Sequence, residues 1–131
     1  MSNLQLPLKK KWFDLTKSGV KTEDYREITD YWLRRLFKHN DYAILDDGLI
    51  DEVIHELKTN KISFPELYDW AGWFPNEFDS NIMTLGYPKS TDSDRILKLE
   101  HKGIEIREGN HEWGAIPGRK YFVILHGSFL K

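Results

Sequence analysis

The sequence predicts an α+β domain built on a small, mostly antiparallel β-sheet or barrel. Patterns typical of helices occupy the first half of the chain, and short runs rich in β-branched and aromatic residues occupy the second, without β-α-β alternation. The chain has 131 residues, of which 40% are hydrophobic and 31% are charged, and this size and composition are typical of one folded domain. We therefore expect a single domain over residues 1–131.

The first half of the chain predicts helices with one short strand among them. Trp12 and Leu15 share one side of a short helix, and Gly19 is placed as the glycine that ends it. Thr29 is a typical N-cap for the amphipathic helix that follows it. The expected elements are a helix over 11–19, an exposed or lining strand over 20–28, and helices over 30–37, 49–57 and 66–71.

The second half predicts short strands that are separated by turns. Gly86-Tyr87-Pro88 and Pro117-Gly118 are the turn signals, because glycine and proline interrupt regular structure. Residues 121–125 form an almost wholly apolar run, which is typical of a strand that is buried on both faces. The expected strands are 82–85, 95–101, 104–107 and 121–126.

The net charge of −2 conceals a strong segregation of charge along the chain. Residues 1–38 carry a net charge of +4, residues 39–82 carry −8, and residues 83–131 carry +2. Both terminal segments are therefore basic, and the middle of the chain is acidic. Basic side chains of this kind neutralise phosphates in nucleic-acid-binding proteins, although solubility alone also explains lysines on a helix face.

Several classes of function lack the residues that they need. The chain has no cysteine, which excludes disulfides, cysteine-ligated zinc and cysteine nucleophiles. The five histidines are scattered without an H-E-x-x-H pattern, so we expect no metal and no cofactor. No glycine-rich phosphate loop or serine-hydrolase elbow occurs. Without an apolar run of about 18 residues or a signal-peptide pattern, we expect a cytoplasmic protein with no membrane contact.

Residues 19–26 read Gly-Val-Lys-Thr-Glu-Asp-Tyr-Arg and resemble the G-x-K-x-x-E-x-R box of ASCH domains, with Asp24 where glutamate is usual. Three further features are similar to a bacterial and phage-associated branch of this family. Lys11-Trp12-Phe13-Asp14 precedes the box, Tyr25-Arg26-Glu27-Ile28-Thr29-Asp30-Tyr31-Trp32 continues it, and Glu112-Trp113-Gly114-Ala115 precedes the last expected strand. The resemblance covers residues 7–38 and 82–131, which leaves residues 39–81 as a family-variable helical insertion.

The resemblance implies a fold, a ligand class and a site. ASCH domains belong to the PUA-like superfamily, so we expect a small PUA-like β-barrel of mostly antiparallel strands with flanking helices. Known members are linked to RNA, which implies that the chain binds RNA, or a nucleotide or nucleoside, in a barrel cleft. The implied catalytic residues are Lys21 and Asp24, and the implied ligand-binding residues are Thr22, Tyr25, Arg26, Trp113, Lys11 and Trp12.

The chemistry of these side chains leaves two interpretations open. A desolvated Lys21 can act as a base or nucleophile, and Arg26 can hold a phosphate with its planar guanidinium. Trp113, in a turn-rich loop, is a candidate for stacking on a base. Alternatively, Lys21 is a surface lysine paired with Glu23 or Asp24, and Asp24 and Arg26 form a structural ion pair.

Two other functions follow from the same observations. One is a small hydrolase, either an amidohydrolase acting on acylated cytidine or a ribonuclease, that uses Lys21. Amidohydrolase members of the family carry a small hydroxyl residue at the position of Asp24, so the carboxylate here removes a hydrogen-bond donor and adds a charge. The other is a protein-interaction module in which the acidic insertion binds a basic partner.

Overall fold

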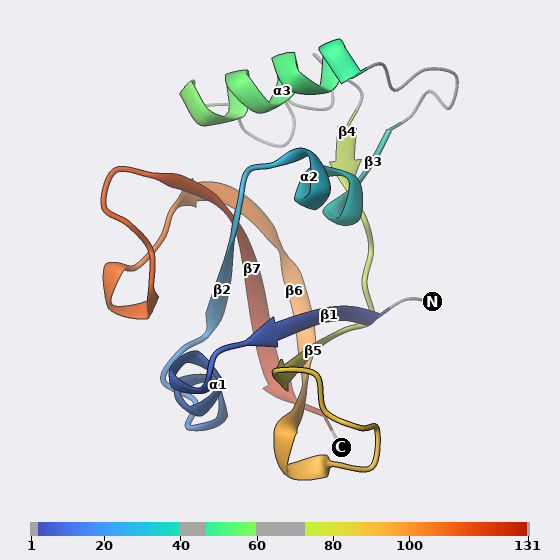
Figure 1. Cartoon of the computed structure of the whole chain (residues 1–131), viewed down its shortest axis with the longest axis vertical. Helices are drawn as coiled ribbons and strands as arrows, with labels where there is room; N and C mark the ends of the chain where they lie inside the picture. Colours follow the sequence, from blue (N-terminus) through green and yellow to red (C-terminus); the bar gives the residue numbers. More distant parts are fainter. Residues whose placement is uncertain (1–2, 40–46, 60–72, 131) are drawn as a thin grey trace. The chain divides into compact units, whose positions relative to one another are not determined.

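The computed structural model describes residues 3–39, 47–59 and 73–130 and shows an α+β arrangement (Figure 1). Two short 3-10 helices, η1 and η2, lie in loops of the second half. The elements follow one another as β1 (Asn3–Leu8), α1 (Lys10–Lys17), β2 (Glu23–Glu27), α2 (Asp30–Leu36), β3 (Phe37–His39), α3 (Asp47–Thr59), β4 (Trp73–Pro75), β5 (Ser80–Leu85), η1 (Ser93–Arg95), β6 (Ile96–Glu108), η2 (His111–Trp113) and β7 (Lys120–Phe129).

Five of the strands form one sheet in the order β1-β5-β6-β7-β2, and β3 and β4 form a separate antiparallel pair. Strand β1 runs parallel to β5, with Asn3 opposite Ser80 and Leu8 opposite Leu85. Strands β5 and β6 are antiparallel. The predicted α+β class with a small, mostly antiparallel sheet is therefore confirmed.

The chain divides into two compact units. The first unit consists of Met1–Asp24, Glu77–Gly103 and Ile124–Lys131, and the second consists of Tyr25–Asn76 and Ile104–Val123. The core of the first unit is formed by apolar side chains of β1, α1, β5, β6 and β7. They are Leu4, Leu6, Leu8, Phe13, Met83, Leu99 and Ile124.

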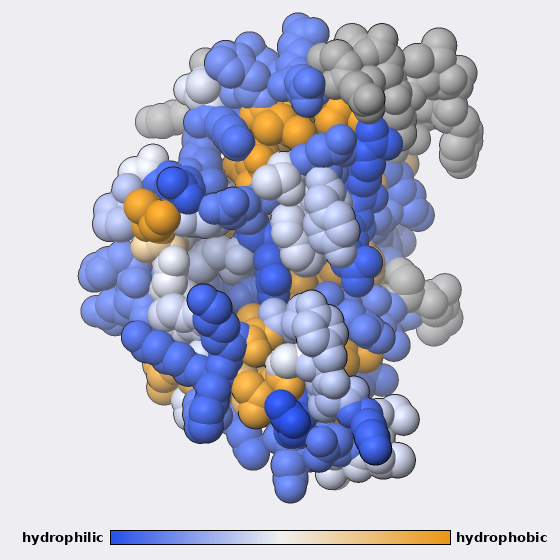
Figure 2. All heavy atoms as spheres, in the orientation of Figure 1, coloured by the Kyte–Doolittle hydropathy of each residue, from blue (hydrophilic) through white to orange (hydrophobic). Residues whose placement is uncertain are grey.

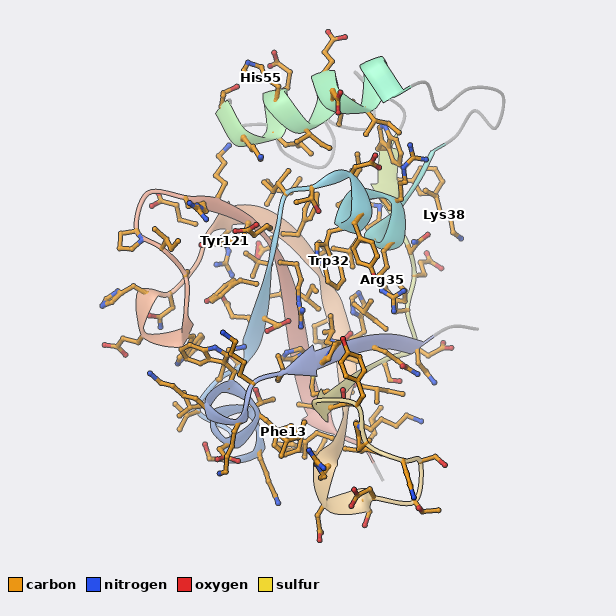
Figure 3. The ribbon with its side chains drawn as sticks, in the orientation of Figure 1. Phe13, Trp32, Arg35, Lys38, His55 and Tyr121 are labelled. Carbon is orange, nitrogen blue, oxygen red and sulfur yellow. The ribbon has the colours of Figure 1, made fainter. Side chains whose placement is uncertain are left out.

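The second unit contains α2, α3, β3, β4 and parts of β2, β6 and β7, and it has its own apolar core. Thr29 caps α2 as predicted, because its Oγ1 accepts a hydrogen bond from the Trp32 amide nitrogen at 3.3 Å. The rings of Phe37 and Phe122 lie 5.3 Å apart, centre to centre. Tyr121, labelled in Figure 3, belongs to the buried run of β7. The predicted burial of this run is confirmed for residues 121–124.

The structure differs from the expected elements at β6 and β1. The strands predicted over 95–101 and 104–107 are one continuous strand, β6, in which Gly103 adopts a φ of 121°. Glycine adopts this positive φ without strain because it has no Cβ. Strand β6 therefore continues through Gly103, between the two segments that were expected to be separate strands. Strand β1 was not predicted, although every second side chain from Leu4 is buried.

The middle of the chain lies only partly within the described residues. The expected helix over 49–57 is α3, which begins two residues earlier and ends two residues later. The expected helix over 66–71 lies outside the described residues. Within the predicted insertion over 39–81, the structure therefore adds β4 and the beginning of β5 to α3.

Hydrophilic side chains cover most of the face that Figure 2 displays, and the apolar areas on it are small and separate. This distribution is typical of a surface in contact with water. In the part of the chain that the structure describes, no helix has both the length and the apolar character that crossing a membrane requires.

Candidate functional site

The end of α1 fixes the position of Lys21 in the first unit. Gly19 has a φ of 86°, a left-handed conformation that glycine adopts without strain. Its amide nitrogen donates to the carbonyl of Thr16 at 3.1 Å, and the amide nitrogen of Lys21 donates to the carbonyl of Leu15 at 3.1 Å. Both bonds satisfy carbonyl groups at the end of the helix, so the backbone of Lys21 is anchored to α1.

Lys21 and Asp24 form a buried ion pair. Nζ of Lys21 lies 3.1 Å from Oδ1 of Asp24 and donates a second hydrogen bond to the carbonyl of Glu23 at 2.6 Å. The two paired side chains are only 1% and 7% exposed, so water and salt screen their attraction little. Lys21 is thus a buried residue rather than a surface lysine, and Asp24 is a charged partner for it.

A chain of hydrogen bonds joins two histidines of the same unit through Asn81. The fully buried Asn81 has its Oδ1 2.7 Å from Nδ1 of His101 and its Nδ2 2.7 Å from Nδ1 of His126. The same Nδ2 donates to the carbonyl of Leu125 at 3.2 Å. The backbone nitrogen of His126 donates to the carbonyl of Thr22 at 3.1 Å, which ties this histidine to the box segment.

Burial controls the charge of His126. It lowers the pKa of His126 from 6.5 to about 4, an effect that Asp24 and Glu23 oppose and that Lys21 and His101 reinforce. His126 is therefore neutral at pH 7. Its Nε2 atom is buried and, among the described residues, has no hydrogen-bond partner.

A pocket of about 400 Å³ opens beside these groups, and all of its lining belongs to the first unit. Among its lining residues, Lys21 is 2% exposed and Phe129 is 49% exposed. The lining consists of Thr16, Gly19, Lys21, Thr22, Leu99, Glu100, Lys102, His126, Gly127, Ser128 and Phe129.

A second ion pair lies in this pocket. Nζ of Lys102 lies 3.5 Å from Oε2 of Glu100, and Oε1 of Glu100 accepts a hydrogen bond from the Ser128 amide nitrogen at 2.8 Å. The bond from Ser128 is the main reason that the pKa of Glu100 is lowered, with Lys102 adding to the effect. Glu100 is therefore a carboxylate at neutral pH, in a position to accept further hydrogen bonds.

A larger pocket, of about 650 Å³, lies in the second unit. Two of its charged lining residues, Glu27 and Arg119, are exposed and form an ion pair at 3.0 Å. Pairs of this kind on the surface are common and contribute little to stability or chemistry. We therefore place the candidate site in the smaller pocket, where buried titratable groups meet.

The other predicted site residues lie on α1 or in the second unit. On α1, Nζ of Lys11 lies 4.9 Å from the centre of the Trp12 ring. In the second unit, the guanidinium of Arg26 stacks over Trp32 at 4.9 Å, and Trp113 lies half-buried in η2.

Tyr25 has a structural role in the second unit. Its hydroxyl accepts a hydrogen bond from the Asn110 amide nitrogen at 2.8 Å, and its ring lies 5.8 Å from that of Tyr121. A Cβ added at Gly109 would come within 2.6 Å of the Tyr25 ring, which shows how closely the loop packs on it. Tyr25 thus holds a loop against a strand.

The sequence reasoning missed Asn81, His101 and His126. They are 20 and 25 positions apart, and only the pairing of strands brings them together. One signal was available, because His126 directly follows the apolar run of β7 and a polar residue at that place needs a buried partner. Among the described residues, no three His, Asp or Glu side chains are grouped so that they could hold a metal ion.

By its fold and its pocket, this chain is an α+β domain with a polar pocket large enough for a small ligand. Comparison with known proteins adds one partial similarity, to delta-latroinsectotoxin-Lhe1a of Latrodectus hesperus. The two chains are 37% identical over 62 residues, which are 47% of this chain and 39% of the toxin. No family model matches the chain, and no solved structure matches it significantly. The matched segment thus spans less than half the length of either protein.

Proposed function

We propose that this chain is a PUA-like domain of the ASCH type that binds a nucleoside or nucleotide, free or within single-stranded RNA, in the pocket beside Lys21. The observation that carries the proposal is the meeting of the buried Lys21–Asp24 pair with a pocket of about 400 Å³. Pockets of this size suit small ligands, and residues with strongly shifted pKa values, such as His126 in this lining, cluster at functional sites.

The side chains around the pocket match the chemistry of a nucleoside. The half-exposed ring of Phe129 offers a surface on which a base can stack. Thr22 and Ser128 contribute hydroxyl groups that can bond to a ribose, and Glu100 can accept a hydrogen bond from an amino or imino group.

The charge balance of the pocket favours the uncharged part of a nucleotide. Lys21 is paired with Asp24 and Lys102 is paired with Glu100, and His126 is neutral at pH 7. Counted with Asp24, which pairs with Lys21 but does not line the pocket, these charges sum to zero, whereas phosphate sites are built from an excess of cations and backbone amides.

Phosphates of an RNA chain would instead lie along α1. This helix and the residue before it expose Lys9, Lys10, Lys11 and Lys17 in the same unit. Each lysine that neutralises a phosphate makes the affinity fall more steeply as the salt concentration rises. We therefore expect RNA binding to depend on salt and nucleoside binding to depend on it much less.

Replacing Phe129 with alanine is expected to weaken the binding of a nucleoside, because it removes the stacking surface. Base–aromatic stacking contributes about 1–3 kcal/mol, which corresponds to roughly 5- to 150-fold in Kd. Isothermal titration with cytidine, uridine and a short single-stranded RNA at two salt concentrations measures the effect. Tyr87→Ala is the matched control, since Tyr87 is 93% exposed and does not line the pocket. An absence of binding by the wild-type chain at low salt would refute the proposed function.

A second function, hydrolysis of acylated cytidine or RNA, is favoured by the cluster of titratable groups around His126, whose pKa is strongly shifted. Nζ of Lys21 donates hydrogen bonds to the carbonyl of Glu23 and to Asp24, and an ammonium group has no lone pair, so a base or nucleophile role requires a proton to pass from Nζ to another group. If it does act, the double variant Lys21→Met with Asp24→Leu is expected to lose at least about 100-fold in rate. Product formation from acetylcytidine and RNA, measured by chromatography, tests this. Equal rates for the two proteins would exclude the role for Lys21.

A further inference from the structure

The hydrogen-bond chain through Asn81 determines which nitrogen of His126 carries the proton. The carbonyl of Leu125 can only accept a hydrogen bond, so the atom of Asn81 that faces it at 3.2 Å is the amide nitrogen. The same nitrogen faces Nδ1 of His126 at 2.7 Å and donates its second proton there. Nδ1 of His126 is thus an acceptor, and the proton of the neutral ring lies on Nε2.

His101 supports this arrangement from the other end of the amide. Oδ1 of Asn81 lies 2.7 Å from Nδ1 of His101 and can only accept, so His101 donates from Nδ1. The ring of His101 is held in turn by an edge-to-face contact with Phe78, at 5.2 Å between centres. All three polar side chains thereby have one consistent direction of donation, from His101 through Asn81 to His126.

The Nε2–H group of His126 is a buried donor without an acceptor among the described residues. The two nitrogens lie on different sides of the ring. Nδ1 faces Asn81 in the interior, so Nε2 is turned away from it. His126 lines the pocket and Asn81 does not. Leaving a buried donor unsatisfied is costly, so such a group in a native protein calls for an acceptor that binds there.

We propose that His126 is a specificity-determining residue that donates from Nε2 to a carbonyl oxygen of the bound base, with its tautomer fixed by Asn81 and His101. The inference rests on the proposed binding of a nucleoside in this pocket. The group can donate but cannot accept, so it favours a base that presents a carbonyl and disfavours one that presents an amino group at the same place. The lowered pKa of His126 keeps the ring in this neutral form at pH 7.

The tautomer is tested directly by a long-range ¹H–¹⁵N NMR spectrum of the free protein labelled at histidine. We expect one protonated and one bare nitrogen for His126 at pH 7, with the proton on Nε2. A proton on Nδ1, or a doubly protonated ring, would overturn the inference and leave the proposed function standing.

The selectivity is tested with inosine and adenosine, which differ at position 6, where inosine has a carbonyl and adenosine an amino group, and at N1, which carries a proton only in inosine. The loss of one hydrogen bond, together with an unpaired donor, predicts that the wild-type chain binds inosine at least about tenfold more tightly than adenosine. His126→Gln keeps an N–H donor on a side chain that can still accept from Asn81, so it retains the preference. His126→Leu removes the donor and should bind both nucleosides with similar affinity.

The outcomes separate the two proposals. Equal affinity of the wild-type chain for inosine and adenosine overturns the role of His126 but not the site, whereas no binding of either nucleoside overturns both. Thermal unfolding of each variant shows whether it is folded. If His126→Leu does not fold, the NMR spectrum and the wild-type comparison still decide the question.

Discussion

Replacing Lys21 with methionine will lower the free energy of unfolding by about 3–5 kcal/mol, because it leaves the carboxylate of Asp24 buried without its cation. Asp24, taken as a whole residue, is 5% exposed, and burial of an unpaired charge has one of the largest effects on stability that a single substitution can produce. Urea unfolding followed by tryptophan fluorescence measures the change.

The double variant, in which Asp24→Leu accompanies Lys21→Met, separates loss of the pair from loss of volume. Replacing both partners of a buried ion pair with apolar residues is often neutral, so we expect most of the lost stability to return. Lys10→Met is the matched control, because Lys10 pairs with Asp14 at 2.6 Å with side chains 77% and 52% exposed. Its effect should stay below about 1 kcal/mol. Equal losses for Lys10→Met and Lys21→Met would contradict the importance of burial.

The free energy of unfolding will fall as the pH decreases from 6.5 to 4. In the unfolded chain His126 takes up a proton near pH 6.5, whereas in the folded chain it does so only near pH 4. Below pH 6.5 the unfolded state therefore binds more protons than the folded state, and acid favours unfolding. The full shift corresponds to about 3 kcal/mol, reached near pH 4.

The contribution of His126 to this pH dependence can be separated from that of a second histidine. His101 also has a pKa lowered by burial, so it adds a smaller effect in the same direction. His126→Gln removes the larger share, and its unfolding free energy should vary less between pH 7 and pH 4 than that of the wild type. Denaturant unfolding at a series of pH values is the measurement. Parallel pH profiles for the two proteins would show that His126 does not titrate as inferred.

The elements that the sequence predicted well are those with local causes. Thr29 was recognised as an N-cap and Gly19 as the end of a helix, because each acts through a hydrogen bond to a residue three positions away. The burial of 121–124 followed from an uninterrupted apolar run. By contrast, two separate strands were expected on either side of Gly103, since local sequence does not distinguish a glycine between strands from a glycine that continues a strand.

The candidate site was predictable only where its parts are close in sequence. Lys21 and Asp24 are three residues apart, so the box motif contains both, and the structure joins them in one ion pair. The partners of His126 come from β5 and β6, and their approach depends on the strand order, which no local pattern encodes. The same box also contains Tyr25 and Arg26, whose described contacts lie with Asn110 and Trp32 in the second unit.

The parallel pairing of β1 with β5 has a consequence for synthesis on the ribosome. Ser80 Oγ donates to Asn3 Oδ1 at 2.7 Å across 77 positions of sequence, so the first strand emerges long before its neighbour exists. Closing so long a loop is entropically costly, and contacts of this range slow folding. His126 comes later still, in the third segment of the first unit. A nascent chain that has not yet reached residue 126 therefore lacks part of the pocket, and ligand binding would report that this last segment has been made and docked.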